Sequence, residues 1–156
     1  MRIEVFDALD STNEEAKRRA QDGEAGPLWI VARAQTAGRG RRGRAWTSAA
    51  GNLFTTGLFR LDASPGRAAQ LSFAAALAVG DLAASVIPSE LVRLKWPNDV
   101  LVDGRKVAGI LLESGSAPGG GLWLAVGIGV NLAHHPEDSE RPATDLSVHG
   151  GGVSPD

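Results

Sequence analysis

Short apolar segments, some of them alternating with polar residues, run along the chain and predict β-strands. The predicted strands cover residues 1–7, 28–34, 53–60, 91–96, 100–102, 106–112 and 122–126. Between two of these strands, Asp103-Gly104-Arg105 predicts a tight hairpin turn, because glycine tolerates the backbone conformation that such a turn requires. Residues 35–48 show no periodicity and predict a loop.

Helical spacing of apolar residues predicts two helices. Ser11 is the expected N-cap of the first, and Glu14, three residues on, fits a capping box. This helix should run to about Gln21. The second covers residues 67–86, and we expect it to be well buried, because Phe73 and Leu77 widen its apolar stripe.

The order of these elements favours an α+β fold, with a mixed, largely antiparallel sheet and the helices packed on one face. A doubly wound parallel sheet would need more crossover helices than the pattern provides. The 156 residues are the size of one domain. We expect this domain to span residues 1–146 and a flexible tail, rich in glycine and turn residues, to occupy 147–156.

Composition and charge narrow the functional classes. Lysine and arginine number 16 against 18 aspartates and glutamates, and the resulting net charge of −2 does not suggest a nucleic-acid or polybasic membrane-binding protein. The absence of cysteine excludes a disulfide scaffold, a thiolate zinc site and a cysteine nucleophile. The sequence has no apolar stretch of membrane-spanning length and no signal-peptide core, so we expect a cytoplasmic protein without membrane contact.

The most informative segment interleaves glycine with arginine. We call residues 38–46, Gly38-Arg39-Gly40-Arg41-Arg42-Gly43-Arg44-Ala45-Trp46, the arginine–glycine loop. Glycine lets a backbone approach a ligand closely, and guanidinium groups bind carboxylate and phosphate in a bidentate manner. The loop therefore predicts a cover over an anionic ligand, with Trp46 offering a flat face to a base or another ring. A flexible basic surface loop that contacts nucleic acid, or nothing, is the alternative on composition alone.

Two further segments suggest polar contacts with a ligand. If Leu94 and Trp96 face the core, Lys95 points the other way, where it can neutralise a phosphate or a developing negative charge; a solvated lysine is the alternative. Asp99 is either a turn residue or a Mg²⁺ ligand beside a nucleotide. Asn131 follows a glycine-containing strand end and can present a donor and an acceptor to a ligand, with a structural turn as the competing interpretation.

In combination these segments resemble the catalytic domain of the biotin protein ligases. The resemblance rests on four segments, which occur in the family's order between about residues 8 and 133. They are Asp10-Ser11-Thr12-Asn13; Gln35-Thr36-Ala37 leading into the arginine–glycine loop; Lys95-Trp96-Pro97-Asn98-Asp99 with Lys106-Val107-Ala108-Gly109-Ile110-Leu111; and Gly127-Ile128-Gly129-Val130-Asn131. The resemblance implies a fold like that of class II aminoacyl-tRNA synthetases and biotin ligases. It also implies a two-step ligase reaction: biotin and ATP, accompanied by Mg²⁺, form biotinyl-5′-AMP, and a carrier-protein lysine then takes the biotinyl group.

The resemblance also implies a role for each matching residue. The biotin-binding set would be Ser11, Thr12, Asn13, Gln35, Gly38, Arg39, Gly40, Arg41 and Lys95. The nucleotide-binding set would be Arg41, Arg42, Arg44, Trp46 and Asn131. Lys95 and Arg41 would be the catalytic residues, with Lys95 neutralising charge on the carboxylate and α-phosphate, and Asp99 would be a metal ligand.

The implied partner is the biotin carboxyl carrier protein domain of acetyl-CoA carboxylase or a related carboxylase. The N-terminal DNA-binding domain of some relatives has no counterpart in this sequence, so we expect no DNA binding. The family's C-terminal β-barrel has none either, so we expect either a truncated chain or a weakened second step, and a homodimer is compatible with the resemblance. A lipoate ligase or octanoyltransferase is the alternative enzyme, although the arginine–glycine loop favours biotin. An RNA-contacting module is the rival from another class, and the net charge of −2 argues against it.

Overall fold

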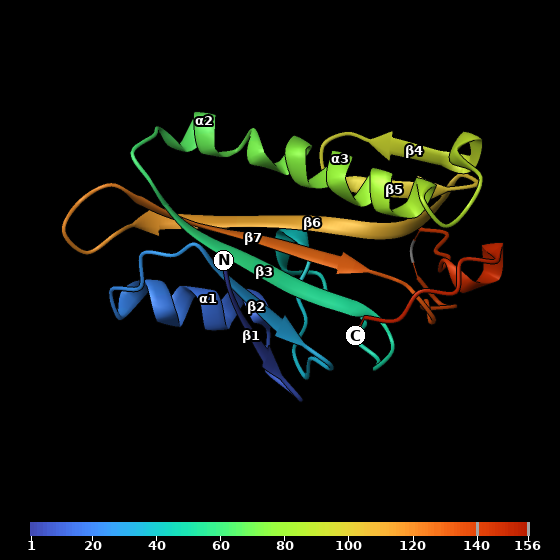
Figure 1. The fold of residues 1–156 in the computed structure, drawn as a ribbon, viewed down its shortest axis with the longest axis horizontal. Coiled ribbons are helices and arrows are strands. Elements are labelled where there is room, and N and C mark those ends of the chain that lie inside the picture. Colours follow the sequence, from blue (N-terminus) through green and yellow to red (C-terminus); the bar gives the residue numbers. More distant parts are fainter. Residues whose placement is uncertain (140, 156) are drawn as a thin grey trace.

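The computed structural model describes residues 1–139 and 141–155. Within these residues the chain forms a seven-stranded sheet with the order β1-β2-β3-β7-β6-β5-β4 (Figure 1). The strands are β1 (Arg2–Phe6), β2 (Leu28–Ala32), β3 (Leu53–Leu61), β4 (Val92–Lys95), β5 (Asp99–Val102), β6 (Arg105–Ser116) and β7 (Leu122–Val130). β1 and β2 are parallel and the other neighbouring pairs are antiparallel, so the predicted α+β fold with a mixed, largely antiparallel sheet is confirmed.

The helices lie on opposite faces of the sheet, and the prediction that they share one face is wrong (Figure 1). They are α1 (Thr12–Gln21) on one face and α2 (Pro65–Ala68) and α3 (Leu71–Ala84) on the other. Successive side chains of a strand point to opposite faces. In β7, Trp123 and Ala125 therefore pack in the cluster under α1, whereas Leu124 and Val126 pack in the cluster under α3. Because both sets are apolar, each face needs its own helical cover.

α3 packs against the sheet through small side chains. Its buried residues are Ala75, Ala76, Val79, Gly80 and Ala83. Phe73 and Leu77 are 46% and 55% exposed, so the prediction that they widen the buried face is wrong. Small residues let the helix lie close to the strands, whereas the larger ones point outward. Among the described residues, none of the helices combines the length and hydropathy that crossing a bilayer requires.

β6 and β7 extend beyond the predicted strands, and this extension builds the floor of the candidate site. The two strands pair from Ala108 opposite Val130 to Ser116 opposite Leu122. Gly127 and Gly129 therefore lie inside a central strand of the sheet, and Asn131 follows that strand directly.

The chain after β7 remains in contact with the core. Ser147–His149 forms a short 3₁₀-helix, and the amide of Gly151 donates to the Leu146 carbonyl over 2.9 Å. Gly151 is buried, and Val153 packs against the cluster under α3. Residues 147–153 therefore form a short helix and contact the core, although the sequence predicts a flexible tail at 147–156. Asp156 lies outside the described residues. The boundary of the catalytic domain at residue 146 stays a prediction.

Candidate functional site

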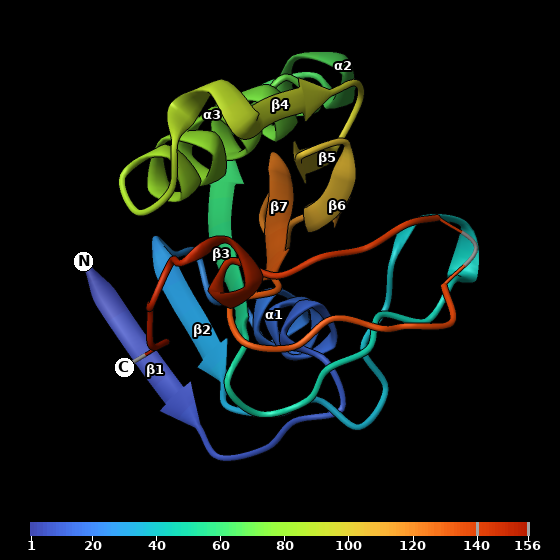
Figure 2. The same ribbon diagram turned by 90° about the vertical axis from the view of Figure 1, so that its right-hand side faces the viewer.

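A cavity of about 740 Å³ opens on the α1 side of the sheet. The start of α1, the arginine–glycine loop and the segment that follows β7 surround it, and Figure 2 shows the loop and that segment projecting from the same side of the molecule. The predicted site residues that line it are Ser11, Thr12, Asn13, Gln35, Arg39, Gly40, Arg41, Arg42, Arg44, Trp46, Lys95, Asp99 and Asn131. The cavity therefore brings all four sequence segments together, while the role of each residue stays a prediction.

Glycine is needed at three positions of the site because other atoms already occupy the space of a side chain. A Cβ atom on Gly127 would lie 2.1 Å from Asn13 Oδ1, and one on Gly129 would lie 2.7 Å from the Trp46 ring. Gly38 does not line the cavity. Its Cβ would lie 2.3 Å from Ser48 Oγ, so this glycine lets the two ends of the arginine–glycine loop approach each other.

Asp10 fixes the start of α1. Its carboxylate accepts two hydrogen bonds of 2.9 Å from Arg18 and one of 2.7 Å from the Ser11 amide. The Arg18 guanidinium lowers the pKa of Asp10 to about 2. The predicted capping box is absent, because Asp10 takes the Ser11 amide and the Ser11 side chain caps no backbone amide of the helix. Glu14 is therefore free to point elsewhere.

A chain of polar side chains runs under the cavity. The Thr12 amide donates to Gln35 Oε1 over 2.8 Å, and Asn13 Nδ2 donates to Glu113 Oε2 over 2.8 Å. The Thr56 hydroxyl lies 2.7 Å from Asn13 Oδ1 and 2.8 Å from the Thr12 hydroxyl, so it can donate to the Asn13 oxygen and accept from the Thr12 hydroxyl. Thr12 and Asn13 are 4% exposed, and their neighbours hold each side chain in one orientation. Such a fixed set of donors and acceptors suits recognition of an amide-like or ureido group.

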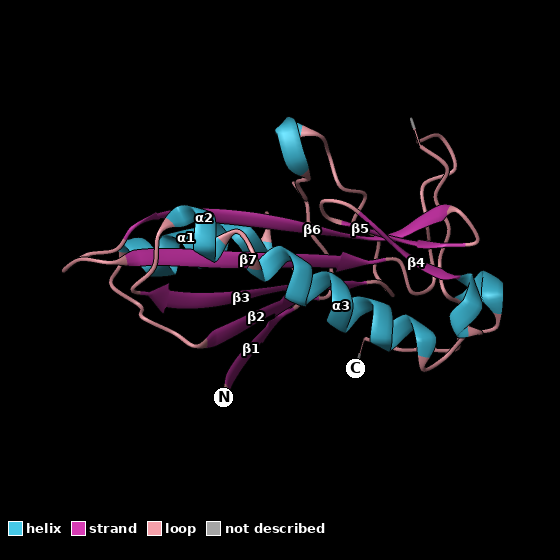
Figure 3. Ribbon diagram, turned by 90° about the horizontal axis from the view of Figure 1, so that it is seen from above, coloured by secondary structure: helices cyan, strands magenta, loops and turns pink. Residues whose placement is uncertain are grey.

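The arginine–glycine loop folds as a narrow ribbon that stands away from the sheet (Figure 3). The Trp46 amide donates to the Gly38 carbonyl over 2.9 Å, and the Gly40 amide donates to the Arg44 carbonyl over 2.7 Å. A single 3₁₀ turn, Arg41–Gly43, closes its tip. Arg41 Nη1 donates to Asn98 Oδ1 over 3.1 Å, so the tip contacts the turn between β4 and β5.

Two ammonium groups line the cavity, and their surroundings differ. Lys106 Nζ lies 2.6 Å from Asp99 Oδ1 and 5.2 Å from the centroid of the Trp46 ring, and its side chain is 25% exposed. Lys95 is exposed and belongs to the edge strand β4. Leu94 and Trp96 are 48% and 79% exposed, so the expectation that both face the core beside Lys95 is wrong.

Asp99 is an ion-pair partner of cationic side chains in this arrangement. Its carboxylate, 8% exposed, contacts Lys106 and also lies 3.5 Å from Arg141 Nη1. The described residues contain no group of three or more His, Cys, Asp or Glu side chains placed to hold a metal ion. The geometry thus gives no support to the predicted metal-binding role of Asp99.

Trp46 and Asn131 lie at the far end of the cavity. The Trp46 ring rests on Gly109 and Gly129, and its Nε1 is buried without a hydrogen-bond partner among the described residues. Asn131 is 3% exposed, and its Nδ2 donates to the Thr144 carbonyl over 3.0 Å. A buried donor such as Trp46 Nε1 is normally satisfied, so an acceptor on a ligand would complete this end of the site.

The sequence patterns give no indication that Lys106, Arg141 and Glu113 belong to the site. Lys106 follows a predicted hairpin turn, and its local sequence gave no sign that its side chain faces Asp99. The one signal in the sequence that could have identified Lys106 is its place in the segment Lys106-Val107-Ala108-Gly109-Ile110-Leu111, which resembles the biotin protein ligases. Arg141 and Glu113 become relevant only through contacts with residues far away in the sequence.

Comparison with known proteins agrees with this geometry. Residues 5–132 match the model of the biotin/lipoate A/B protein ligase family. The chain is 53% identical over 129 residues to the biotin–[acetyl-CoA-carboxylase] ligase of Paracoccus denitrificans, an alignment that covers 82% of this chain and 53% of that protein. The chain therefore spans about half the length of this relative.

Solved structures show the same similarity. One is the biotin protein ligase from Leishmania major in complex with biotinyl-5-AMP, with a TM-score of 0.81, 30% identity and coverage of 99% of this chain and 68% of that chain. Another is the biotin protein ligase from Aquifex aeolicus in complex with biotin and ATP, with a TM-score of 0.74, 30% identity and coverage of 99% and 63%.

Proposed function

Because the chain belongs to the biotin/lipoate A/B protein ligase family, we propose that it activates biotin with ATP and transfers the biotinyl group to a lysine of a biotin carboxyl carrier protein domain. The observation that carries this proposal is the cavity. A buried polar network, a cationic loop and a lysine–aspartate pair converge on it from four separate segments. The similar structures that contain biotinyl-5-AMP, or biotin with ATP, support the same assignment.

The proposed reaction has two steps. In the first, a biotin carboxylate oxygen attacks the α-phosphorus of ATP, and pyrophosphate leaves with the electrons of the broken P–O bond. In the second, a neutral lysine amine attacks the acyl carbon of biotinyl-5′-AMP, AMP leaves with the electrons of the broken acyl C–O bond, and the nitrogen loses one proton to water as the amide forms. Both steps develop negative charge on oxygen, so positioning and fixed positive charge carry most of the catalysis.

The polar network under the cavity would bind the ureido end of biotin. Ser11, Thr12, Asn13 and Gln35 are the proposed contacts, as the resemblance implies. Thr12 and Gln35 bond each other, and Asn13 bonds Glu113 and Thr56, so these side chains are held in place before biotin arrives, which lowers the entropy lost on binding. The main chain of residues 39–41, which line the cavity, would grip the carboxylate and phosphate region.

We assign the neutralisation of charge at the reacting phosphate to Lys106 first and to Lys95 second. The ammonium of Lys106 lies between Asp99 and the Trp46 ring, in a partly enclosed part of the cavity where charge acts strongly. Lys95 is exposed on an edge strand, where water screens it. Arg41 would add a second positive charge from the loop.

The nucleotide would occupy the end of the cavity near Trp46 and Asn131, with Arg42 and Arg44 close to its phosphates. Mg²⁺ would accompany ATP and neutralise phosphate charge. This ion binds proteins through one or two carboxylates while phosphates and waters complete its shell. Since the Asp99 carboxylate contacts two cations, the phosphates are the proposed principal ligands of the ion.

The carrier and the compartment are proposed from the family. The acceptor would be the carrier domain of acetyl-CoA carboxylase or a related carboxylase, the protein would act in the cytoplasm, and a homodimer is compatible with the family. The lipoate alternative is not favoured, because the similar proteins reported above are named for biotin.

Exchange of radiolabel between pyrophosphate and ATP tests the first step on the purified chain. We expect exchange that requires biotin and is not supported by lipoate. Exchange with lipoate alone would move the function to lipoate activation, and no exchange with either acid would contradict the proposal. Addition of a carrier domain then tests the second step by the mass increase of one biotinyl group.

A further inference from the structure

We propose that Glu14 and Glu113 are positioning residues that anchor Arg39 and thereby hold the arginine–glycine loop over the cavity. The Arg39 side chain is then a structural anchor of the loop, while the loop main chain faces the ligand. The part of this inference that concerns retention of the adenylate rests on the proposed function. The part that concerns the loop itself does not.

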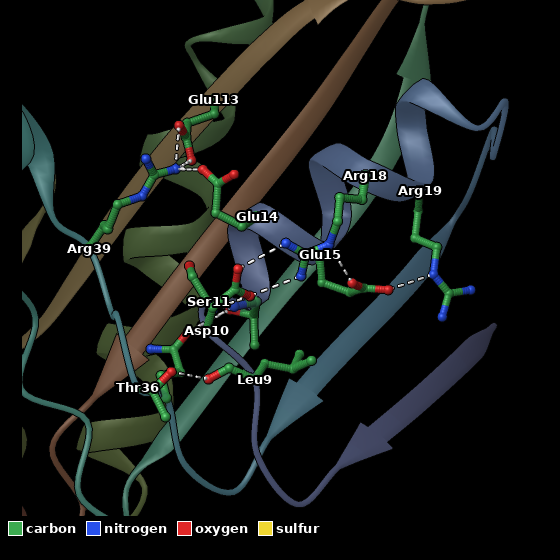
Figure 4. A network of polar contacts seen from close by, with 12 residues as sticks. Leu9, Asp10, Ser11, Glu14, Glu15, Arg18, Arg19, Thr36, Arg39 and Glu113 are labelled. Atoms are coloured by element: carbon green, nitrogen blue, oxygen red, sulfur yellow. Dashed lines mark hydrogen bonds and ion pairs between the residues drawn. The ribbon is translucent and has the colours of Figure 1, made fainter.

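The anchor consists of one guanidinium between two carboxylates from different elements. Arg39 Nη2 contacts Glu14 Oε1 from α1 and lies 3.2 Å from Glu113 Oε1 and 3.4 Å from Glu113 Oε2 on β6 (Figure 4). The three side chains are 41%, 26% and 30% exposed. Glu14 and Glu113 do not belong to the lining of the cavity. The contact therefore fixes the loop from outside the space that a ligand would fill.

Glu14 is available for this contact because it does not cap its helix. In a capping box its side chain would accept the Ser11 amide. Asp10 takes that amide over 2.7 Å, and Glu14 turns to the loop instead. Glu14 thus contacts Arg39, which lies 25 residues further along the chain, instead of capping its own helix.

Glu113 connects the anchor to the buried polar network. Its Oε2 accepts Asn13 Nδ2 over 2.8 Å, and Asn13 in turn accepts the Thr56 hydroxyl over 2.7 Å. At the other end of the network, Gln35 Nε2 donates to Ser48 Oγ over 2.9 Å, and Ser48 Oγ donates to the Trp46 carbonyl over 3.0 Å. The network therefore touches both ends of the loop. Ligand groups that order Asn13 or Gln35 would also order the loop.

Electrostatics makes the anchor depend on charge. Two carboxylates beside one guanidinium attract it more strongly than either alone, and they repel each other when it leaves. Because Arg39 and Ala45 form an isolated bridge across the ribbon, fixing Arg39 also fixes the opposite strand of the loop. Loss of one carboxylate should free the tip, Arg41–Gly43, although the substituted glutamate itself does not line the cavity.

Limited digestion with trypsin measures the loop directly, because the enzyme cleaves after arginine and the loop contains Arg41, Arg42 and Arg44. We expect Glu14→Gln and Glu113→Gln each to speed cleavage at these sites in the ligand-free protein by about 1.5- to 5-fold, the range for one partly exposed charged contact. Glu15→Gln is the matched control. It removes a carboxylate from the same helix, where Glu15 pairs with Arg18 and Arg19 away from the loop (Figure 4).

A double-mutant cycle distinguishes positioning from a general loss of stability. In an Arg39→Ala background, Glu113→Gln should have no further effect on cleavage, and Arg39→Lys should restore part of the protection. Cleavage after Arg60 should be unchanged throughout, since its backbone is paired with β7 and its side chain donates to the Gly120 carbonyl rather than to the anchor. In the protein loaded with biotin and ATP, the two glutamine variants should release biotinyl-adenylate about 1.5- to 5-fold faster than Glu15→Gln.

The proposal is overturned if Glu14→Gln and Glu113→Gln are cleaved like Glu15→Gln, or if the effect of Glu113→Gln persists without Arg39. A chain that fails to form adenylate while the digestion pattern holds would count against the proposed function and leave the anchor supported. If the two glutamine variants are cleaved faster but retain the adenylate normally, the anchor holds the loop only in the ligand-free protein, and its role in retention is overturned.

Discussion

Replacing Lys106 by methionine removes the ammonium from the cavity while keeping a flexible side chain of similar length. In the structure this ammonium lies 2.6 Å from Asp99, in a side chain that is 25% exposed. Lys95→Met is the matched change at the other lysine of the cavity, whose side chain is exposed. Comparing the two variants shows which of the two lysines neutralises charge at the reacting phosphate.

The magnitudes expected for the two variants differ. Loss of a charge-assisted contact made chiefly in the transition state costs about 2.7–4 kcal/mol, or 10²–10³ in rate, and we expect this loss for Lys106→Met. This variant should also unfold more easily by about 1–3 kcal/mol, because Asp99, 8% exposed, keeps only Arg141 at 3.5 Å as a cationic partner. For Lys95→Met we expect a loss below about 10-fold and a stability change within about 0.5 kcal/mol, as for other exposed substitutions.

Biotin-dependent exchange of pyrophosphate into ATP gives the rate, and urea denaturation gives the free energy of unfolding. The double variant Lys106→Met/Asp99→Asn should recover most of the stability without recovering the rate, since it removes the uncompensated carboxylate and not the need for positive charge. If Lys95→Met abolishes exchange and Lys106→Met does not, the role belongs to Lys95, as the sequence analysis first assigned it, and our assignment from burial and pairing is refuted.

Three further predictions follow from the site. Arg41→Gly should loosen the loop tip and let biotinyl-adenylate escape, so that unrelated lysines in the mixture become biotinylated; labelling that stays confined to the carrier, detected by avidin blotting, would contradict this. Gly127→Ala should lower the free energy of unfolding by about 1–3 kcal/mol and weaken biotin binding, because the new Cβ would lie 2.1 Å from Asn13 Oδ1. Calorimetry measures both properties, and an unchanged biotin affinity would count against the position of Asn13 in the site. The pKa of Asp10 is lowered from 3.8 to about 2 by Arg18, so the stability that this pair contributes is present above pH 4 and is lost as the pH falls towards 2; solvent screening limits it to about 1 kcal/mol, and Asp10→Asn should flatten this part of the pH profile of unfolding.

The sequence predicted the strands because their apolar pattern is local, and it predicted the four site segments because their residue types are unusual. It could not predict the partners of these residues. Asn13 and Glu113 are 100 positions apart, and Arg39 and Glu113 are 74 apart. These contacts depend on the register of β6 against β7, and nothing in the sequence near Asn13 or Arg39 encodes that register.

The capping box shows how a correct local signal can lead to a wrong contact. Ser11 begins the helix as predicted, and Glu14 stands at the spacing that a capping box needs. The structure contains a stronger local competitor, Asp10, which bonds the Ser11 amide and is itself held by Arg18. A charged group already fixed by a guanidinium accepts a backbone amide at little further entropic cost, so the glutamate is released for another use.

The sequence does contain a sign that helices cover both faces of the sheet. The segment Leu122-Trp123-Leu124-Ala125-Val126 contains no polar residue, and a strand with one solvated face would alternate. Such a strand must be buried on both sides, which requires helices on both sides, as α1 and α3 provide. This division also explains why the site lies where it does. α3 approaches its face closely through alanine and glycine, whereas α1 covers only part of the other face and leaves the glycine-lined ends of β6 and β7 open for a ligand.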